Sequence, residues 1–151
     1  FKEGTPEHII EGAISRFIEA LKYQLNAASK IPTKSGAMPH STSFRYLWCR
    51  ERKTSGVPHY HFLALLSGNA YRSVGHYEMG LDNLYSRISY AWNSAIKQPQ
   101  VTSYVSMTNG GTFLLKRGES YDALFKAGSY LCKAYTKEFS AHGNSFGYSR
   151  L

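Results

Sequence analysis

Apolar residues recur at helical spacing near the start of the chain, and this pattern predicts a helix over residues 6–28. The apolar positions are Ile9, Ile10, Ala13, Phe17, Ala20, Leu21 and Leu25. Thr5 is the expected N-cap, Pro6 suits the first turn, and Glu7 lies near the positive end of the helix dipole. Residues 29–41, with two prolines and a glycine, are expected to form a polar loop.

Two strand-like stretches follow. Residues 43–52, "SFRYLWCRER", and residues 59–66 flank the turn sequence "KTSGVP", and we expect an antiparallel hairpin. Alternate side chains of a strand share a face. If the turn centres on residue 55 or 56, Glu51 faces the same side as His59 and His61, directly opposite or diagonal.

One carboxylate and two imidazoles on neighbouring strands predict a three-ligand site for a divalent cation. The alternative for His59 and His61 is that they are ordinary half-buried polar residues near a turn.

Beyond the hairpin, the pattern predicts two more helices, at 81–96 and 121–137, with Ser120 as the N-cap of the second. The other expected segments are a loop at 67–80, a strand at 101–107, a strand or extended segment at 113–117, and an irregular tail at 138–151.

The last predicted helix places Tyr130, Lys133 and Lys137 within about 60° of one another on one face. Ammonium groups beside a phenol favour its nucleophilic phenolate form, so Tyr130 is a candidate nucleophile with the two lysines stabilising charge. Tyr135 is the competing candidate, but it lies about 140° further round the helix and has no lysine three residues later. The alternative is a tyrosine at the edge of the core and two solvated lysines.

Composition narrows the class of partner. The chain of 151 residues, sized for a single domain over 1–151, carries 18 lysines and arginines against 10 acidic residues, a net charge of +8. Such a charge suits a polyanion or an acidic membrane surface, or serves solubility alone. No stretch has the length of a membrane span. Cys49 and Cys132 are the two cysteines and suggest no disulfide framework, so we expect a cytoplasmic protein.

These motifs together resemble the HUH endonucleases, the nucleases of rolling-circle replication, conjugation and some transposition. The blocks "RERKTSGVPHYHFLALL", "AWNSAI", "YLCKAYTK" and "FGYSR" are most similar to the inovirus (filamentous phage) replication proteins, which also occur in cryptic prophages. The resemblance covers roughly residues 44–151. It implies an α+β fold, a central antiparallel sheet with helices packed on it. It also implies an enzyme that nicks one DNA strand, keeps the 5′ phosphate on tyrosine and leaves a 3′ hydroxyl.

By this resemblance His59 and His61 bind Mg²⁺ or Mn²⁺, Tyr130 is the nucleophile, and Lys133 fills the lysine position of the tyrosine motif. Glu51 is the expected third ligand from its spacing. The expected partner is single-stranded or hairpin DNA at a replication origin in a bacterial host, with host replication proteins and without a membrane.

Basic residues on and after the hairpin are candidates for contacts to the DNA backbone: Arg45, Arg50, Arg52, Lys53 and Arg72. Tyrosines are candidates for stacking on bases, although a core position is the commoner role: Tyr60, Tyr71 and Tyr77.

Two other classes fit the same residues, namely a DNA-binding prophage remnant without catalysis and an unrelated metal-dependent hydrolase. HUH enzymes usually carry an apolar strand before the first helix, whereas this sequence enters that helix almost directly.

Overall fold

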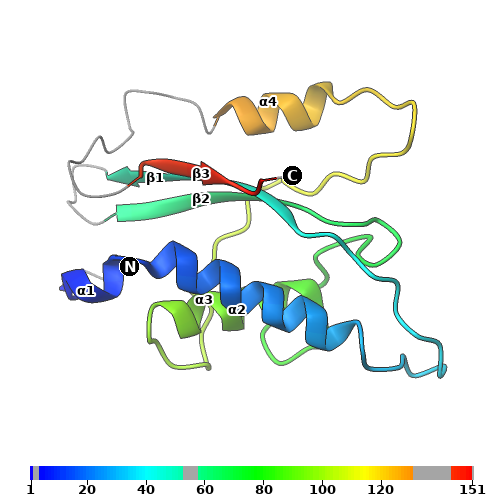
Figure 1. The fold of residues 1–151 in the computed structure, drawn as a ribbon, viewed down its shortest axis with the longest axis horizontal. Helices are drawn as coiled ribbons and strands as arrows, with labels where there is room; N and C mark the ends of the chain where they lie inside the picture. Colours follow the sequence, from blue (N-terminus) through cyan, green and yellow to red (C-terminus); the bar gives the residue numbers. More distant parts are fainter. Residues whose placement is uncertain (2–3, 53–57, 131–143, 151) are drawn as a thin grey trace. The chain divides into compact units, whose positions relative to one another are not determined.

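The structure is a computed structural model that describes residues 1, 4–52, 58–130 and 144–150. In this part of the chain it holds four helices and a three-stranded antiparallel sheet (Figure 1), which confirms the α+β class. The chain forms two compact units. The sheet unit comprises Phe1–Gly4, Phe44–Leu65 and Leu115–Leu151, and the helical unit comprises Thr5–Ser43 and Leu66–Leu114.

The helix expected over 6–28 is two helices, α1 (Glu7–Ile10) and α2 (Ala13–Ala28), so the prediction of one continuous helix is wrong. The break falls at Gly12, whose φ of +68° is a left-handed conformation that glycine adopts without steric cost.

The ends of these helices are held by contacts to backbone carbonyls that the sequence pattern does not reveal. Pro6 occupies the N-cap position of α1, in place of the expected Thr5. Arg16 of α2 reaches back across the break and donates hydrogen bonds to the carbonyls of Ile9 and Glu11. The break is therefore bridged by a side chain, and the apolar face continues through it, with Ile9 buried as Phe17 is.

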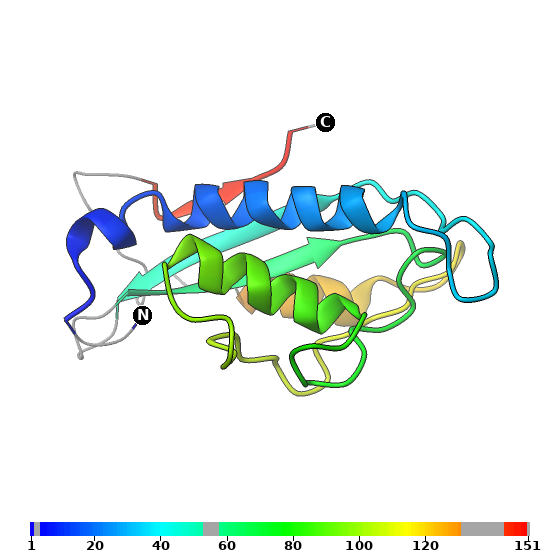
Figure 2. The same cartoon turned by 90° about the horizontal axis from the view of Figure 1, so that it is seen from below.

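Helices α2 and α3 (Leu84–Ala95) run side by side in the helical unit (Figure 2). This confirms the helix expected at 81–96. The side chain of Asn83 caps α3 by accepting a hydrogen bond of 2.8 Å from the N–H of Ser86. Phe17 and Trp92 join the two helices, with ring centroids 5.5 Å apart in an edge-to-face arrangement.

The strand expected at 101–107 is absent from the described residues, so this prediction is wrong. The buried side chain of Asn93 takes the place of a partner strand. Its Nδ2 donates to the carbonyl of Thr102 at 2.7 Å, and its Oδ1 accepts from the N–H of Tyr104 at 3.4 Å. A buried amide thus satisfies the backbone groups that a sheet ladder would otherwise pair.

The predicted hairpin is confirmed as β1 (Arg45–Arg52) and β2 (Pro58–Leu65). The two strands pair antiparallel, from Arg45 opposite Leu65 to Arg52 opposite Pro58. This register puts the centre of the turn at residue 55, as expected. Figure 2 shows the two strands as the longest of the sheet.

The tail, expected to be irregular, instead supplies β3 (Phe146–Tyr148), and this correction completes the sheet in the order β2-β1-β3. Leu47 pairs with Tyr148, and Cys49 with Phe146. Gly147, between them, lies against the indole of Trp48 so closely that a Cβ there would be 2.7 Å from Nε1. The strand can approach β1 because position 147 has no side chain.

Helix α4 (Asp122–Tyr130) lies over the sheet in the sheet unit (Figure 1). A Cβ on Gly128 would be 3.8 Å from Leu63 of β2, so the helix contacts the face on which Leu63 lies. The hydroxyl of Ser120 accepts a hydrogen bond of 3.1 Å from the N–H of Asp122. The first half of the helix expected over 121–137 is thus confirmed, and its second half lies outside the described residues.

Residues 113–117 form no strand in the described structure, and Arg117 begins a turn.

Candidate metal centre

The candidate metal centre is created by the register of the hairpin. Glu51 is directly opposite His59, and His61 is opposite Cys49, two pairs further along. Cross-strand partners point to the same side of a sheet, as do alternate residues of one strand. The three side chains therefore lie on the same face, in the opposite and diagonal positions that the sequence predicted.

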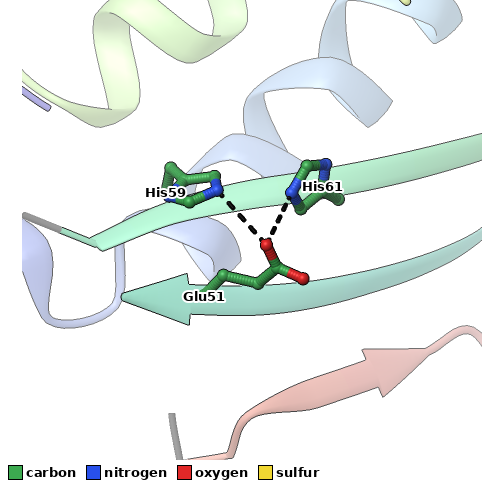
Figure 3. A group of neighbouring side chains, drawn as sticks. All are labelled: Glu51, His59 and His61. Carbon is green, nitrogen blue, oxygen red and sulfur yellow. Dashed lines mark hydrogen bonds and ion pairs between the residues drawn. The ribbon is translucent and has the colours of Figure 1, made fainter. Parts of the chain in front are cut away.

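The imidazoles of His59 and His61 converge on the carboxylate of Glu51 (Figure 3). Its Oε2 is 3.0 Å from Nε2 of His61 and 3.4 Å from Nε2 of His59. Glu51 is buried, whereas about a third of each imidazole is exposed, 33% for His59 and 34% for His61. The carboxylate is thus shielded from solvent, whereas the two imidazoles are accessible to it.

These residues fit a divalent cation. The ligand atoms of Glu51, His59 and His61 all lie within 4.8 Å of one another. Two ligand atoms bound to one ion at about 2.1 Å each can be at most about 4.2 Å apart, so small side-chain rotations suffice to bring all three onto one ion. Carboxylate and imidazole ligands suit several divalent metals, and the ligand set alone does not choose among them.

Tyr130 is brought next to this group. It is the last residue of α4, it is 53% exposed, and its ring centroid is 6.3 Å from that of His61. The helix and the hairpin thus place a phenol beside the histidine pair, as a tyrosine nucleophile would require. Lys133, Tyr135 and Lys137 lie outside the described residues.

Of the arginines expected to contact DNA, Arg45 and Arg50 lie on opposite faces of the sheet. Arg45 is half-buried on the same face as Glu51, and its guanidinium donates a hydrogen bond of 2.7 Å to the carbonyl of Arg150. Arg50 lies on the opposite face and is only 8% exposed, so its side chain offers little surface to a phosphate. Arg72 is exposed in the helical unit.

Arg52 is the last residue of β1, and Lys53 lies outside the described residues.

The three candidate stacking tyrosines have different surroundings. The ring of Tyr60 packs edge-on against Trp48, with centroids 5.7 Å apart. Both lie on the face opposite Glu51, His59 and His61, which together are the candidate metal group. Tyr71 is half-buried, and burial raises its pKa, while Arg87 lowers it and Asp82 raises it. Tyr77 is exposed.

Two aromatic residues that the sequence reasoning missed share the face of the metal group. Phe146 pairs with Cys49 and Tyr148 with Leu47, and both aromatic side chains are exposed, at 61% and 63%. The signal was the alternation in "FGY", an aromatic residue on either side of a glycine. Three residues are too few for a period-two pattern to stand out from an irregular tail.

Comparison with known proteins gives the family. The profile of the YagK/YfjJ C-terminal domain matches residues 7–149, almost the whole chain. The chain belongs to this family. It is 33% identical to the Escherichia coli K12 protein YfjJ over an alignment of 148 residues. The alignment covers 92% of the chain and 71% of YfjJ. It is 30% identical to YagK of the same strain over 151 residues, 93% of the chain and 70% of YagK.

Both relatives are described as uncharacterized proteins, so membership of the YagK/YfjJ family supplies no activity. No solved structure matches the chain. In the described residues no helix combines the length and the apolar character needed to cross a bilayer.

Proposed function

We propose that this chain is a metal-dependent endonuclease of the HUH type, which cuts and rejoins single-stranded DNA at a phage- or plasmid-type origin to initiate rolling-circle replication. The observation that carries the proposal is the tyrosine beside a carboxylate and two histidines, with the rings of Tyr130 and His61 6.3 Å apart. The resemblance of the hairpin and tyrosine motifs to the HUH endonucleases supports the same assignment of roles.

The chemistry assigned to the chain is a transesterification. The Oη of Tyr130 attacks the phosphorus of the scissile phosphodiester, and the bond from phosphorus to the 3′ oxygen breaks. The tyrosine loses its proton and the departing 3′ oxygen gains one. The products are a 5′-phosphotyrosine and a free 3′ hydroxyl, and attack by a 3′ hydroxyl on the phosphotyrosine reverses the step and rejoins the strand.

Glu51, His59 and His61 are assigned to hold the divalent cation, Mg²⁺ or Mn²⁺. When bound, the cation supplies positive charge that polarises a phosphate oxygen. Burial of Glu51 favours this role, because a carboxylate removed from water needs a charged or hydrogen-bonding partner. In the sequence, Lys133 and Lys137 follow Tyr130 at helical spacing and are assigned to neutralise charge on the phosphate.

The substrate class follows from charge. The net charge of +8 suits a polyanion. Single-stranded DNA is favoured among polyanions by the resemblance, because the related nucleases act on unpaired strands.

The test is a covalent-adduct assay. The 151-residue chain is incubated with Mn²⁺ and labelled single-stranded DNA, from the origin region of the encoding genome or from a random pool, and run on a denaturing gel. We expect a protein–DNA band that requires Mn²⁺, is absent in EDTA and is lost in Tyr130→Phe. Tyr121→Phe is the matched control, because Tyr121 is also an exposed tyrosine, at 60%, immediately before α4.

Three other results would assign to the chain a different nucleophile or a different class of function. An adduct lost in Tyr135→Phe but retained in Tyr130→Phe would keep the reaction class and change the nucleophile. Strand cleavage without an adduct would indicate a hydrolase that uses water. Binding of origin DNA with neither cleavage nor adduct would indicate a DNA-binding remnant.

A further inference from the structure

The exposed aromatic residues of β3 have no role in the chemistry proposed above, and their position relative to the metal group is fixed by strand register. Phe146, Cys49 and His61 form one row across the sheet, and Tyr148, Leu47 and Leu63 form the next. Because cross-strand partners face the same side, both aromatic rings lie on the face that carries Glu51, His59 and His61.

Distances across the sheet can be estimated from strand geometry. Neighbouring strands are about 4.8 Å apart, so Phe146 on β3 is about 10 Å across the sheet from His61 on β2. Phe146 and Tyr148 are alternate residues of one strand and are therefore about 6.8 Å apart along it. A nucleic acid strand whose scissile phosphate lies at the metal group could reach both rings within a few nucleotides.

The rings of Phe146 and Tyr148 are largely exposed to solvent. Large aromatic side chains contribute most when buried, yet Phe146 and Tyr148 are 61% and 63% exposed. The glycine between them explains their direction. Gly147 lies against the indole of Trp48 on the opposite face, which fixes the side of the strand on which its two neighbours project.

Cationic groups accompany the rings. Arg45 lies on the same face at the Tyr148 end of β1. Its guanidinium donates a hydrogen bond to the carbonyl of Arg150, an exposed residue two positions after Tyr148. Of the three arginines on β1, Arg45 is the one that strand parity places on this face. Exposed aromatic rings beside arginines match the stacking bases and charged backbone of a nucleic acid strand.

We propose that Phe146 and Tyr148 form a stacking platform for unpaired DNA bases next to the metal group, with Arg45 and Arg150 contacting the flanking phosphates. Their spacing of about 6.8 Å is twice the rise of about 3.4 Å per base along a duplex strand. The platform therefore accepts bases that have been spread apart, which an unpaired strand permits without the unstacking cost that a duplex pays. This inference rests on the proposed function and names the residues that hold its substrate.

The test measures binding in EDTA, where no cleavage occurs. Fluorescein-labelled oligo(dT) is titrated with the 151-residue chain and followed by anisotropy. Stacking on aromatic rings typically accounts for at least about a fivefold change in affinity for each base. We therefore expect Phe146→Ala and Tyr148→Ala each to weaken binding at least about fivefold, and Tyr148→Phe, which keeps the ring, to bind as wild type does.

Controls separate stacking from folding. Phe146→Leu keeps an apolar side chain and removes the ring, and it should weaken binding as Phe146→Ala does. Tyr23→Ala removes a still more exposed ring, at 73%, from α2 of the helical unit and should leave binding unchanged. In a Trp92→Phe background, Trp48 fluorescence reports whether β3 still pairs with β1 in each variant.

The outcomes are distinct from those of the adduct assay. Alanine variants that bind oligo(dT) within twofold of wild type would overturn the platform even if the adduct forms. Loss of binding in these variants would support it even if no adduct is found, and nicking would then be the proposal that fails. Duplex DNA bound as tightly as oligo(dT), or oligo(U) bound tenfold more tightly than oligo(dT), would also overturn an assignment to single-stranded DNA.

Discussion

Gly147 offers the most direct test of the sheet that carries the candidate site. A Cβ added at this position would lie 2.7 Å from Cε2 and Nε1 of Trp48 and 2.8 Å from Cζ2. Non-bonded heavy atoms prefer about 3.5–4.0 Å, so the overlap is about 0.8–1.3 Å. Trp48 is buried and cannot simply turn its ring into solvent. Overpacking of this kind costs about 1–3 kcal/mol, and we expect Gly147→Ala to lower the free energy of unfolding by that amount.

The same substitution at Gly128 provides a matched control with the opposite sign. Gly128 lies within α4, and a Cβ there meets Leu63 at 3.8 Å, an ordinary contact. Because alanine is favoured over glycine inside a helix by about 1 kcal/mol, Gly128→Ala should raise the free energy of unfolding. Both variants are made in a Trp92→Phe background, which leaves Trp48 as the one indole reporting on urea denaturation.

The comparison can refute the packing argument. If Gly147→Ala unfolds at the same urea concentration as its parent, or at a higher one, then β3 does not approach Trp48 as closely as the structure has it. The row positions of Phe146 and Tyr148 beside the metal group would then lose their support. If Gly128→Ala is destabilised as strongly as Gly147→Ala, the effect belongs to alanine substitution in general and not to the indole contact.

The remaining predictions concern the metal group and the helical unit. Mn²⁺ at about 100 times its dissociation constant should stabilise the wild type by about 2.7 kcal/mol, seen as a higher melting temperature than in EDTA, and Glu51→Gln should lose most of this difference. Asn83→Ala should destabilise the chain by about 1 kcal/mol in urea denaturation because α3 loses its N-cap. Burial raises the pKa of Tyr71, so the folded state keeps a proton that the unfolded state releases above about pH 10. Stability from this group is complete below that pH and falls as the pH rises further, and Tyr71→Phe should make the fall above about pH 10 shallower.

The sequence by itself determined the hairpin and the metal group. Alternation of apolar and polar residues on either side of a glycine-containing turn specifies two strands, and the period of two then fixes which side chains share a face. Once the turn centre was placed near residue 55, Glu51 had to face His59 and His61. Local pattern is sufficient here because the partners are close in sequence.

Only the tertiary structure decided the third strand, the break in the first helix and the absence of a strand at residues 101–107 among the described residues. β3 pairs with β1 across nearly a hundred residues, and its decisive feature is the absence of a side chain at Gly147 against Trp48. Residues 101–107 have strand-like composition, but the amide of Asn93 satisfies their backbone groups instead. The third strand depends on pairing between segments distant in sequence, which no local period encodes. The other two outcomes depend on side-chain hydrogen bonds, those of Arg16 and of Asn93, to which a hydrophobic period is equally blind.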